Sequence, residues 1–437
     1  MFRKVFIIVL AVASITITAC HIINEESDYS LECLVTDIRS PNFVSLSQAT
    51  DVANSFAKEK GFVLPTRGNV LSIKNTFTVK DRDSSSIVHA INFEGGGFTL
   101  VSCDNRIMPI LAYSDQGNFS FSDSRSPLGL KIWVETVRNM IEEVKSKDKK
   151  QEPEIKAAWE KYSSTPINKL KTRSLTPDGW PPPEADTVVG PLITDSWHQF
   201  EPYNESLGQF QHYYYLAGAL TPSIICRPTI GCVPLTIVRV MKYHQYPSNF
   251  NWSIMPDTTP INSTTKNYIR TVHEDVKTFA LSIQSNAFMY FKYPNDTTRL
   301  TSVLNTVPIG SFMQSQYGYA SGEDDDFSSS YYENMRRDLI DHELPCIIRG
   351  TDSNSNNGHA WICDGYSYSC VYLNTPIDPD DEQGVLITTY LHHCWGETTT
   401  TVDGWYWATD YTLNGVNRRY NMKLTRHISP IDYWPDE

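Results

Sequence analysis

The strongest constraint in the sequence is a cysteine at the start of a predicted buried helix. In Gly231-Cys232-Val233-Pro234 the proline fits a first helical turn, where its missing N–H has no cost. Apolar residues then recur at helical spacing as far as Met241, which predicts an amphipathic helix. The helix dipole would stabilise a thiolate at this N-terminus, and Gly231 would allow close backbone approach to the sulfur. Cys232 is therefore a candidate nucleophile, although a buried structural cysteine is the commoner occurrence.

A histidine in a matching context lies further along the chain. His359 follows a turn-forming loop and opens the apolar run Ala360-Trp361-Ile362, which predicts a strand. It comes 127 residues after Cys232 (359 − 232 = 127), near the roughly 130 residues that separate this pair in papain-type enzymes. An imidazole there could take the thiol proton and later protonate a leaving amine. A lone histidine is otherwise most often a hydrogen-bonded structural residue.

A third candidate is Gln199, upstream of the cysteine in Trp197-His198-Gln199. Its side-chain NH₂, together with the backbone N–H of Cys232, could hold the oxyanion of a tetrahedral intermediate. Taken alone, Gln199 would be interpreted as a polar loop residue.

Charge and composition exclude some classes of protein. The 437 residues include 37 Lys and Arg against 50 Asp and Glu, a net charge of -13. This balance argues against binding nucleic acid through its phosphates. The sequence also lacks a phosphate loop, a dinucleotide fingerprint and paired Cys-x-x-Cys metal ligands.

The N-terminus predicts export. Arg3 and Lys4 precede an apolar run from Val5 to Ile17, which is too short to span a bilayer. Small residues before Cys20 resemble a bacterial lipobox, so we expect a signal peptide over 1–19, lipidation of Cys20 and a tether over 20–40. An ordinary secretory signal is the alternative. The expected location is the bacterial cell envelope, with a lipid anchor on the periplasmic face or the cell surface.

The rest of the chain predicts two folded units. The first, 41–147, contains a helix from Ser47 to Ala57 with Ser47 as N-cap, two strands around Gly95-Gly96-Gly97, and a second helix from Trp133 to Val144. A charged, proline-rich linker over 148–187 follows. The second unit, 188–437, has helical patterns and then strand-like runs, among them 359–366 and 370–373. This order predicts an α+β fold with a helical lobe facing an antiparallel sheet lobe.

Together these segments resemble the streptopain family of bacterial cysteine peptidases. Gly231-Cys232-Val233 with the downstream Met241-Lys242-Tyr243-His244-Gln245-Tyr246-Pro247 is similar to its nucleophile segment. Gly358-His359-Ala360-Trp361 followed by Asp364-Gly365-Tyr366 is similar to its histidine segment. Trp197, Gln199, Pro202, Tyr203 and Asn204 match its oxyanion-side segment, and Phe43 to Ala49 resembles the opening of its prodomain.

The resemblance implies a papain-like catalytic domain, an inhibitory prodomain over 41–147 and activation by cleavage within 148–187. It implies hydrolysis of internal peptide bonds in protein or peptide substrates, with no metal or organic cofactor and no nucleic-acid partner. Two alternatives use the same fold. One is a degenerate paralogue with weak or no turnover, kept for binding or as a scaffold, and the other is an acyl transferase.

One segment departs from the family pattern, which has an asparagine before a Trp-Gly pair. If Trp395-Gly396 is the first Trp-Gly of the pattern, Cys394 replaces the asparagine, and if it is the second, His392 does. In both cases the asparagine is absent, so another group must orient His359. We expect a backbone carbonyl near Cys394 first, Asp403 second and His392 third, with Trp395 covering the imidazole. Asp364 is predicted to be a turn residue on the opposite strand face from His359.

Overall fold

The computed structural model describes most of the chain beyond its N-terminal segment. The described residues are 40–62, 66–67, 70–81, 83–122, 126–163, 187–216, 219–282, 288–290, 301–303, 307–320, 323–326, 331–351, 358–372, 385–396, 402–408 and 422–433. The predicted signal peptide, Cys20, nearly all of the tether and residues 164–186 of the linker lie outside them. Within the described residues, no helix combines the length and apolar character that crossing a bilayer requires.

The N-terminal unit combines three helices with an antiparallel sheet. Its principal elements are α2 (Leu46–Glu59), β3 (Ile73–Lys80), β4 (Ser86–Phe93), β5 (Phe98–Ser102), β6 (Ile110–Ser114), α3 (Leu128–Ser146) and α4 (Pro153–Tyr162), with the short strands β1 (Thr66–Arg67) and β2 (Val70–Leu71). The helix α2 begins after Ser45, not after Ser47 as expected, because Ser45 and Gln48 form a capping box. The helix α4 lies inside the segment predicted as linker and packs against α2.

The C-terminal unit contains β7 (Thr187–Val189), β8 (Phe210–Leu216), β9 (Ala219–Cys226), α5 (Cys232–His244), η1 (Trp252–Ile254), α6 (Ser263–Ser282), β10 (Phe288–Tyr290), β11 (Thr301–Val303), α7 (Ile309–Tyr317), β12 (Glu323–Asp326), α8 (Tyr331–Arg336), η2 (Arg337–Asp341), β13 (Cys346–Thr351), β14 (Gly358–Tyr372), β15 (Val385–Cys394), β16 (Gly404–Trp407), β17 (Lys423–Arg426) and η4 (Ile431–Tyr433). The helices α5 to α8 precede the strands from β13 on, as predicted, but the strands β7, β8 and β9 come before the first helix and β10, β11 and β12 lie among the helices. The α+β class is confirmed. The runs predicted as two strands over 359–366 and 370–373 form one strand, β14.

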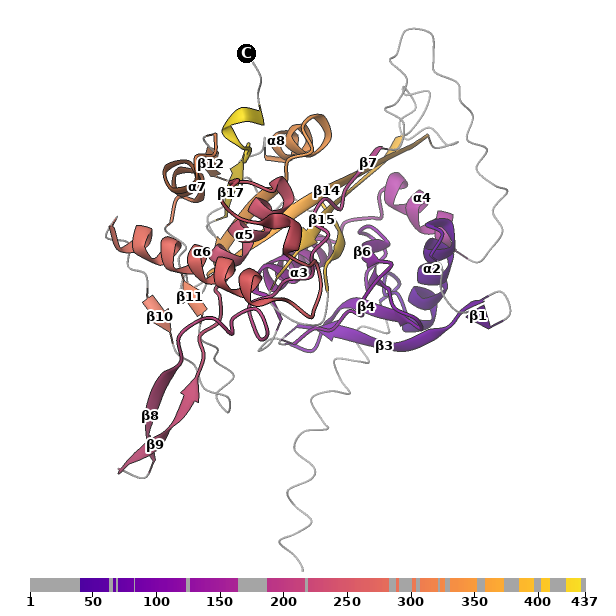
Figure 1. The fold of residues 1–437 in the computed structure, drawn as a ribbon. Helices are drawn as coiled ribbons and strands as arrows, with labels where there is room; N and C mark the ends of the chain where they lie inside the picture. The colour runs from indigo at the N-terminus through magenta and orange to yellow at the C-terminus, as the bar shows by residue number, and fades with distance from the viewer. Residues whose placement is uncertain are drawn as a thin grey trace, which may run out of the picture.

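The two units share a single sheet, which the sequence did not predict. Its strand order is β12-β17-β13-β14-β15-β16-β6-β5-β4-β3, and β7 pairs with β14. The joint lies between β16 and β6, where Trp405 faces Tyr113 and Tyr406 faces Ala112. Figure 1 shows the indigo and purple strands of the N-terminal unit beside the orange and yellow strands of the C-terminal unit.

The strand β14 is covered on both faces, because its side chains alternate between two cores. Ala360 and Ile362 belong to one buried cluster with the apolar face of α5. Trp361 and Cys363 belong to another, which includes Trp133 of α3. The helix that starts at Cys232 therefore packs on one face of this strand and a helix of the N-terminal unit on the other (Figure 1).

At Gly129, α3 lies directly against two tryptophan rings. A Cβ at this position would lie 2.6 Å from Cζ3 of Trp395 and 2.9 Å from Cε3 of Trp361. We expect Gly129→Leu to lower the free energy of unfolding of the full chain by about 1–3 kcal/mol through overpacking. Denaturant titration measures the change. Gly208→Leu is the control, because nothing lies within 4 Å of a Cβ there. Equal stability of the two variants would contradict this packing.

Candidate active site

Cys232 is the first residue of α5, and its side chain is buried at 4% exposure. Gly231 precedes it with φ +89°, a conformation that favours glycine, and the carbonyl of Gly231 accepts from Leu235 N at 3.1 Å. Pro234 lies in the first turn, where it breaks no hydrogen bond. The structure therefore places the sulfur at the positive end of a helix dipole, as predicted.

Ile230, the residue before Gly231, connects the nucleophile segment to Gln199. Ile230 N donates to the carbonyl of Gln199 at 3.1 Å, and Ile230 O bonds Nδ1 of His273 at 2.7 Å. The Gln199 side chain is 1% exposed, and its Oε1 finds no hydrogen-bond partner within the described part of the chain. Gln199 and Cys232 thus lie on neighbouring segments joined by a backbone hydrogen bond, and the oxygen of the buried Gln199 amide has no partner among the described residues.

His359 is the second residue of β14, opposite Gly350 of β13, and is buried. Its Nε2 lies 2.9 Å from the backbone oxygen of Trp395. A carbonyl can only accept, so Nε2 carries a hydrogen, and in the neutral ring Nδ1 is the basic nitrogen. A backbone carbonyl next to Cys394 thus holds the imidazole, as we expected first.

Trp395 acts on His359 through its main chain. Its N–H donates to Oδ1 of Asp403 at 2.8 Å. Gly396 follows with φ +68°, and a Cβ there would lie 3.1 Å from Cδ2 of Leu235 on α5. The ring stacked beside the imidazole is that of Trp361, with centroids 6.0 Å apart, while the Trp395 ring packs on Trp361 at 5.5 Å. We expected the Trp395 ring to cover the imidazole; instead Trp361 stacks beside it, and Trp395 contacts Trp361.

A buried ion pair joins α5 to the segment that leads to Gln199. Arg239 Nε donates to Oδ1 of Asp195 at 2.8 Å, and Nη2 donates to the Asp195 carbonyl at 2.8 Å. Oδ1 of Asp195 also accepts from Trp197 N at 3.0 Å. Sequence reasoning missed this pair. Its signal was an arginine among apolar residues on a helix predicted to be buried.

Asp364 is not the turn residue that we predicted. It lies within β14 at a β-bulge, where the register with β15 shifts between Cys363 and Gly365, and it is fully buried. Its Oδ2 accepts from Ile193 N at 2.9 Å, and its Oδ1 lies 2.6 Å from Nδ1 of His392. Burial would raise the pKa of Asp364, but the neighbouring His392 outweighs it, and the pKa is lowered. The carboxylate thus forms an ion pair with His392.

The fold and these segments together define a papain-like architecture: a helix that begins with Cys232 packs on strand β14, whose second residue is His359. Residues 197–406 match the model of the peptidase C10 family, and residues 41–141 match that of the Spi protease inhibitor. The chain therefore belongs to the peptidase C10, or streptopain, family and carries the inhibitor-type prodomain of that family.

A solved structure supports the fold. The chain is similar to a fragment of prointerpain A from Prevotella intermedia, in a cysteine-to-alanine mutant, with a TM-score of 0.52 and 16% sequence identity. The match covers 81% of this chain and 98% of the other. The papain-like fold with its N-terminal unit is thereby confirmed. Comparison with curated protein sequences gave no match.

Asp403 offers a test of how His359 is oriented. Asp403→Asn should keep most of the activity, because an amide oxygen can still accept from Trp395 N. Asp403→Ala leaves that N–H without its acceptor, at a cost of about 1–3 kcal/mol, so kcat should fall roughly tenfold or more. Steady-state kinetics on folded protein measures both. A loss on the order of 10⁴ from Asp403→Asn would mean that the carboxylate itself orients the histidine.

Gln199 offers a test of the oxyanion site. Gln199→Ala should lower kcat by roughly 10²–10³ with little change in KM, since one donor to the oxyanion is lost. Gln199→Glu is the matched variant: it keeps the size and the backbone bond to Ile230 but removes the NH₂ group. If either substitution changes only KM, Gln199 binds substrate and does not stabilise the transition state.

Proposed function

We propose that this protein is an exported cysteine endopeptidase made as a zymogen, with Cys232 as nucleophile and His359 as general base. The hydrogen bond from His359 Nε2 to the Trp395 carbonyl carries the proposal, because it leaves Nδ1 as the proton acceptor. His359 takes the thiol proton, and the thiolate attacks the peptide carbonyl. The imidazolium then protonates the leaving amine, and water hydrolyses the acyl-enzyme.

The absence of the family's asparagine does not favour the degenerate alternative, which rests on the altered segment around Cys394. Here the main chain of the next residue supplies the acceptor, and Asp403 and Gly396 fix its position. The chemistry of a cysteine–histidine pair is therefore available without the asparagine side chain.

The N-terminal unit is proposed to keep the enzyme inactive until cleavage. Its helix α3 packs on Trp361 and Trp395, the aromatic layer beside His359. Because α4 is folded as far as Tyr162, the expected cleavage region narrows to the chain between Tyr162 and Thr187. Export with a lipid on Cys20 is part of the proposal and rests on residues 1–20.

The decisive experiment compares four preparations on a denatured protein substrate. Chain cut between Tyr162 and Thr187 by an added protease should hydrolyse it, and the uncut chain should be nearly inactive. The cut Cys232→Ala variant should be inactive, while the cut Cys346→Ser variant, which changes another buried thiol, should stay active. More than a few per cent activity in Cys232→Ala would remove this cysteine from the mechanism, and a fully active uncut chain would refute the zymogen.

A further inference from the structure

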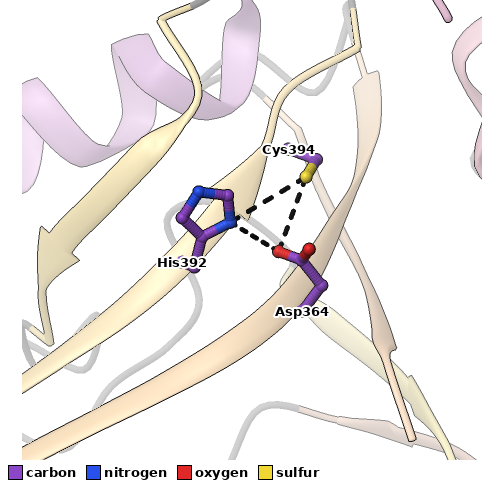
Figure 2. Close-up of side chains that lie close together, drawn as sticks. All are labelled: Asp364, His392 and Cys394. Atoms are coloured by element: carbon purple, nitrogen blue, oxygen red, sulfur yellow. Dashed lines mark hydrogen bonds and ion pairs between the residues drawn. The ribbon is translucent and has the colours of Figure 1, made fainter. Parts of the chain in front are cut away.

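Three buried side chains of different chemistry converge beside the end of β15. Oδ1 of Asp364 lies 2.6 Å from Nδ1 of His392 and 3.5 Å from Sγ of Cys394, and Sγ lies 3.9 Å from that nitrogen. Figure 2 shows the three atoms pointing toward one another from two adjacent strands. A carboxylate oxygen, an imidazole nitrogen and a sulfur are thus aimed at one point.

The local backbone explains why these side chains meet. His392 and Cys394 are two residues apart on β15, so they project from the same face. The bulge in β14 makes Asp364 the extra residue between the partners of His393 and His392, and its carboxylate reaches both His392 and Cys394. The mechanism of peptide hydrolysis proposed above uses none of the three.

The spacing of the donor atoms suits a tetrahedral zinc ion. Zinc binds sulfur at about 2.3 Å and nitrogen or oxygen at about 2.0–2.2 Å, so tetrahedral donor pairs lie roughly 3.3–3.6 Å apart. The sulfur–oxygen separation is 3.5 Å and the sulfur–nitrogen separation 3.9 Å. Only the 2.6 Å pair must open, by roughly 0.7 Å, once a metal replaces the shared proton. Thiolate and imidazole together favour zinc over calcium or magnesium.

The surroundings support such a site. Ile193 N donates to the second oxygen of Asp364 at 2.9 Å, which leaves Oδ1 directed at the centre of the cluster. Zn²⁺ would displace one proton from the His392 nitrogen and one from the Cys394 thiol. The net charge of the buried group is then unchanged, so the exchange buries no additional charge.

We propose that Asp364, His392 and Cys394 form a zinc site with three protein ligands and with water in the fourth position of the tetrahedron. Cys394 immediately precedes Trp395, so the metal anchors the segment whose carbonyl holds His359. The site is separate from the catalytic pair: peptide hydrolysis still proceeds by cysteine and histidine alone. The proposal departs from the sequence-based expectation of a protein without metal, and its binding test does not depend on peptidase activity.

Cobalt(II) substitution tests the site in the full chain carrying Cys232→Ala, which removes the catalytic thiol as a competing ligand. We expect one equivalent of Co²⁺ to give thiolate-to-cobalt charge-transfer absorption and tetrahedral ligand-field bands, and one equivalent of Zn²⁺ to displace it. Adding Cys394→Asn, the residue of the family pattern, should abolish the charge-transfer band. Loss of a residue that only hydrogen-bonds a metal ligand lowers metal affinity by roughly 10- to 100-fold. Because Cys394→Asn removes a ligand itself, zinc affinity should fall by more than that.

Cys346→Ser is the matched control, because it removes another buried thiol from the neighbouring strand β13 and should leave the band unchanged. If Cys394→Asn does not fold, His392→Gln is the alternative test. It keeps the thiol but removes the imidazole ligand, so zinc affinity should fall by the same amount as expected for Cys394→Asn. The proposal is overturned if folded Cys232→Ala protein binds no stoichiometric metal. It is equally overturned if the band survives in Cys394→Asn or if the affinity survives in His392→Gln. Either result would leave the cluster as an aspartate–histidine ion pair.

Discussion

The buried guanidinium of Arg239 is the constraint around which the active-site segments are arranged. The Arg239 side chain is 2% exposed. Burying an unpaired charge there would cost more free energy than the net stability of a typical protein. Burial alone would lower the pKa of Arg239, but Asp195 and further acidic groups around it raise the pKa. The helix of the nucleophile and the segment that leads to Gln199 therefore cannot separate without breaking a buried pair, at about 3–5 kcal/mol.

Local chemistry made much of the site predictable. The proline in the first turn and the apolar spacing after Cys232 fix α5, and a loop before an apolar run fixes the start of β14. The position of Asp364 was predicted wrongly because a β-bulge breaks the two-residue period from which the face of a strand residue is inferred. The pair of Arg239 with Asp195 was not predicted because its partners are 44 residues apart, and sequence pattern does not specify which distant charge a buried cation will meet.

The shared sheet was not predicted for a similar reason. It also affects how the N-terminal unit of such a zymogen would separate from the C-terminal unit. Each unit has its own periodic pattern, but nothing local reveals that β16 and β6 pair, since strand pairing is non-local. The joint has two residue pairs, whereas α3 contributes a broad apolar surface to the core beneath Trp361. Cutting the linker removes neither contact. Release of the prodomain therefore requires either dissociation against this apolar burial or further proteolysis of the prodomain itself.

The asparagine of the family pattern is absent from this segment, and the main-chain carbonyl of Trp395 holds His359. A side-chain amide must be held by its rotamer, whereas the Trp395 carbonyl is held by strand β15 on one side and by Gly396 against α5 on the other. Asp403 adds a third restraint through the Trp395 N–H. Because the acceptor no longer comes from residue 394, the side chain there can take on other chemistry. A thiol that faces His392 and Asp364 across the bulge then makes a metal ligand of a position that the family pattern gives to an amide.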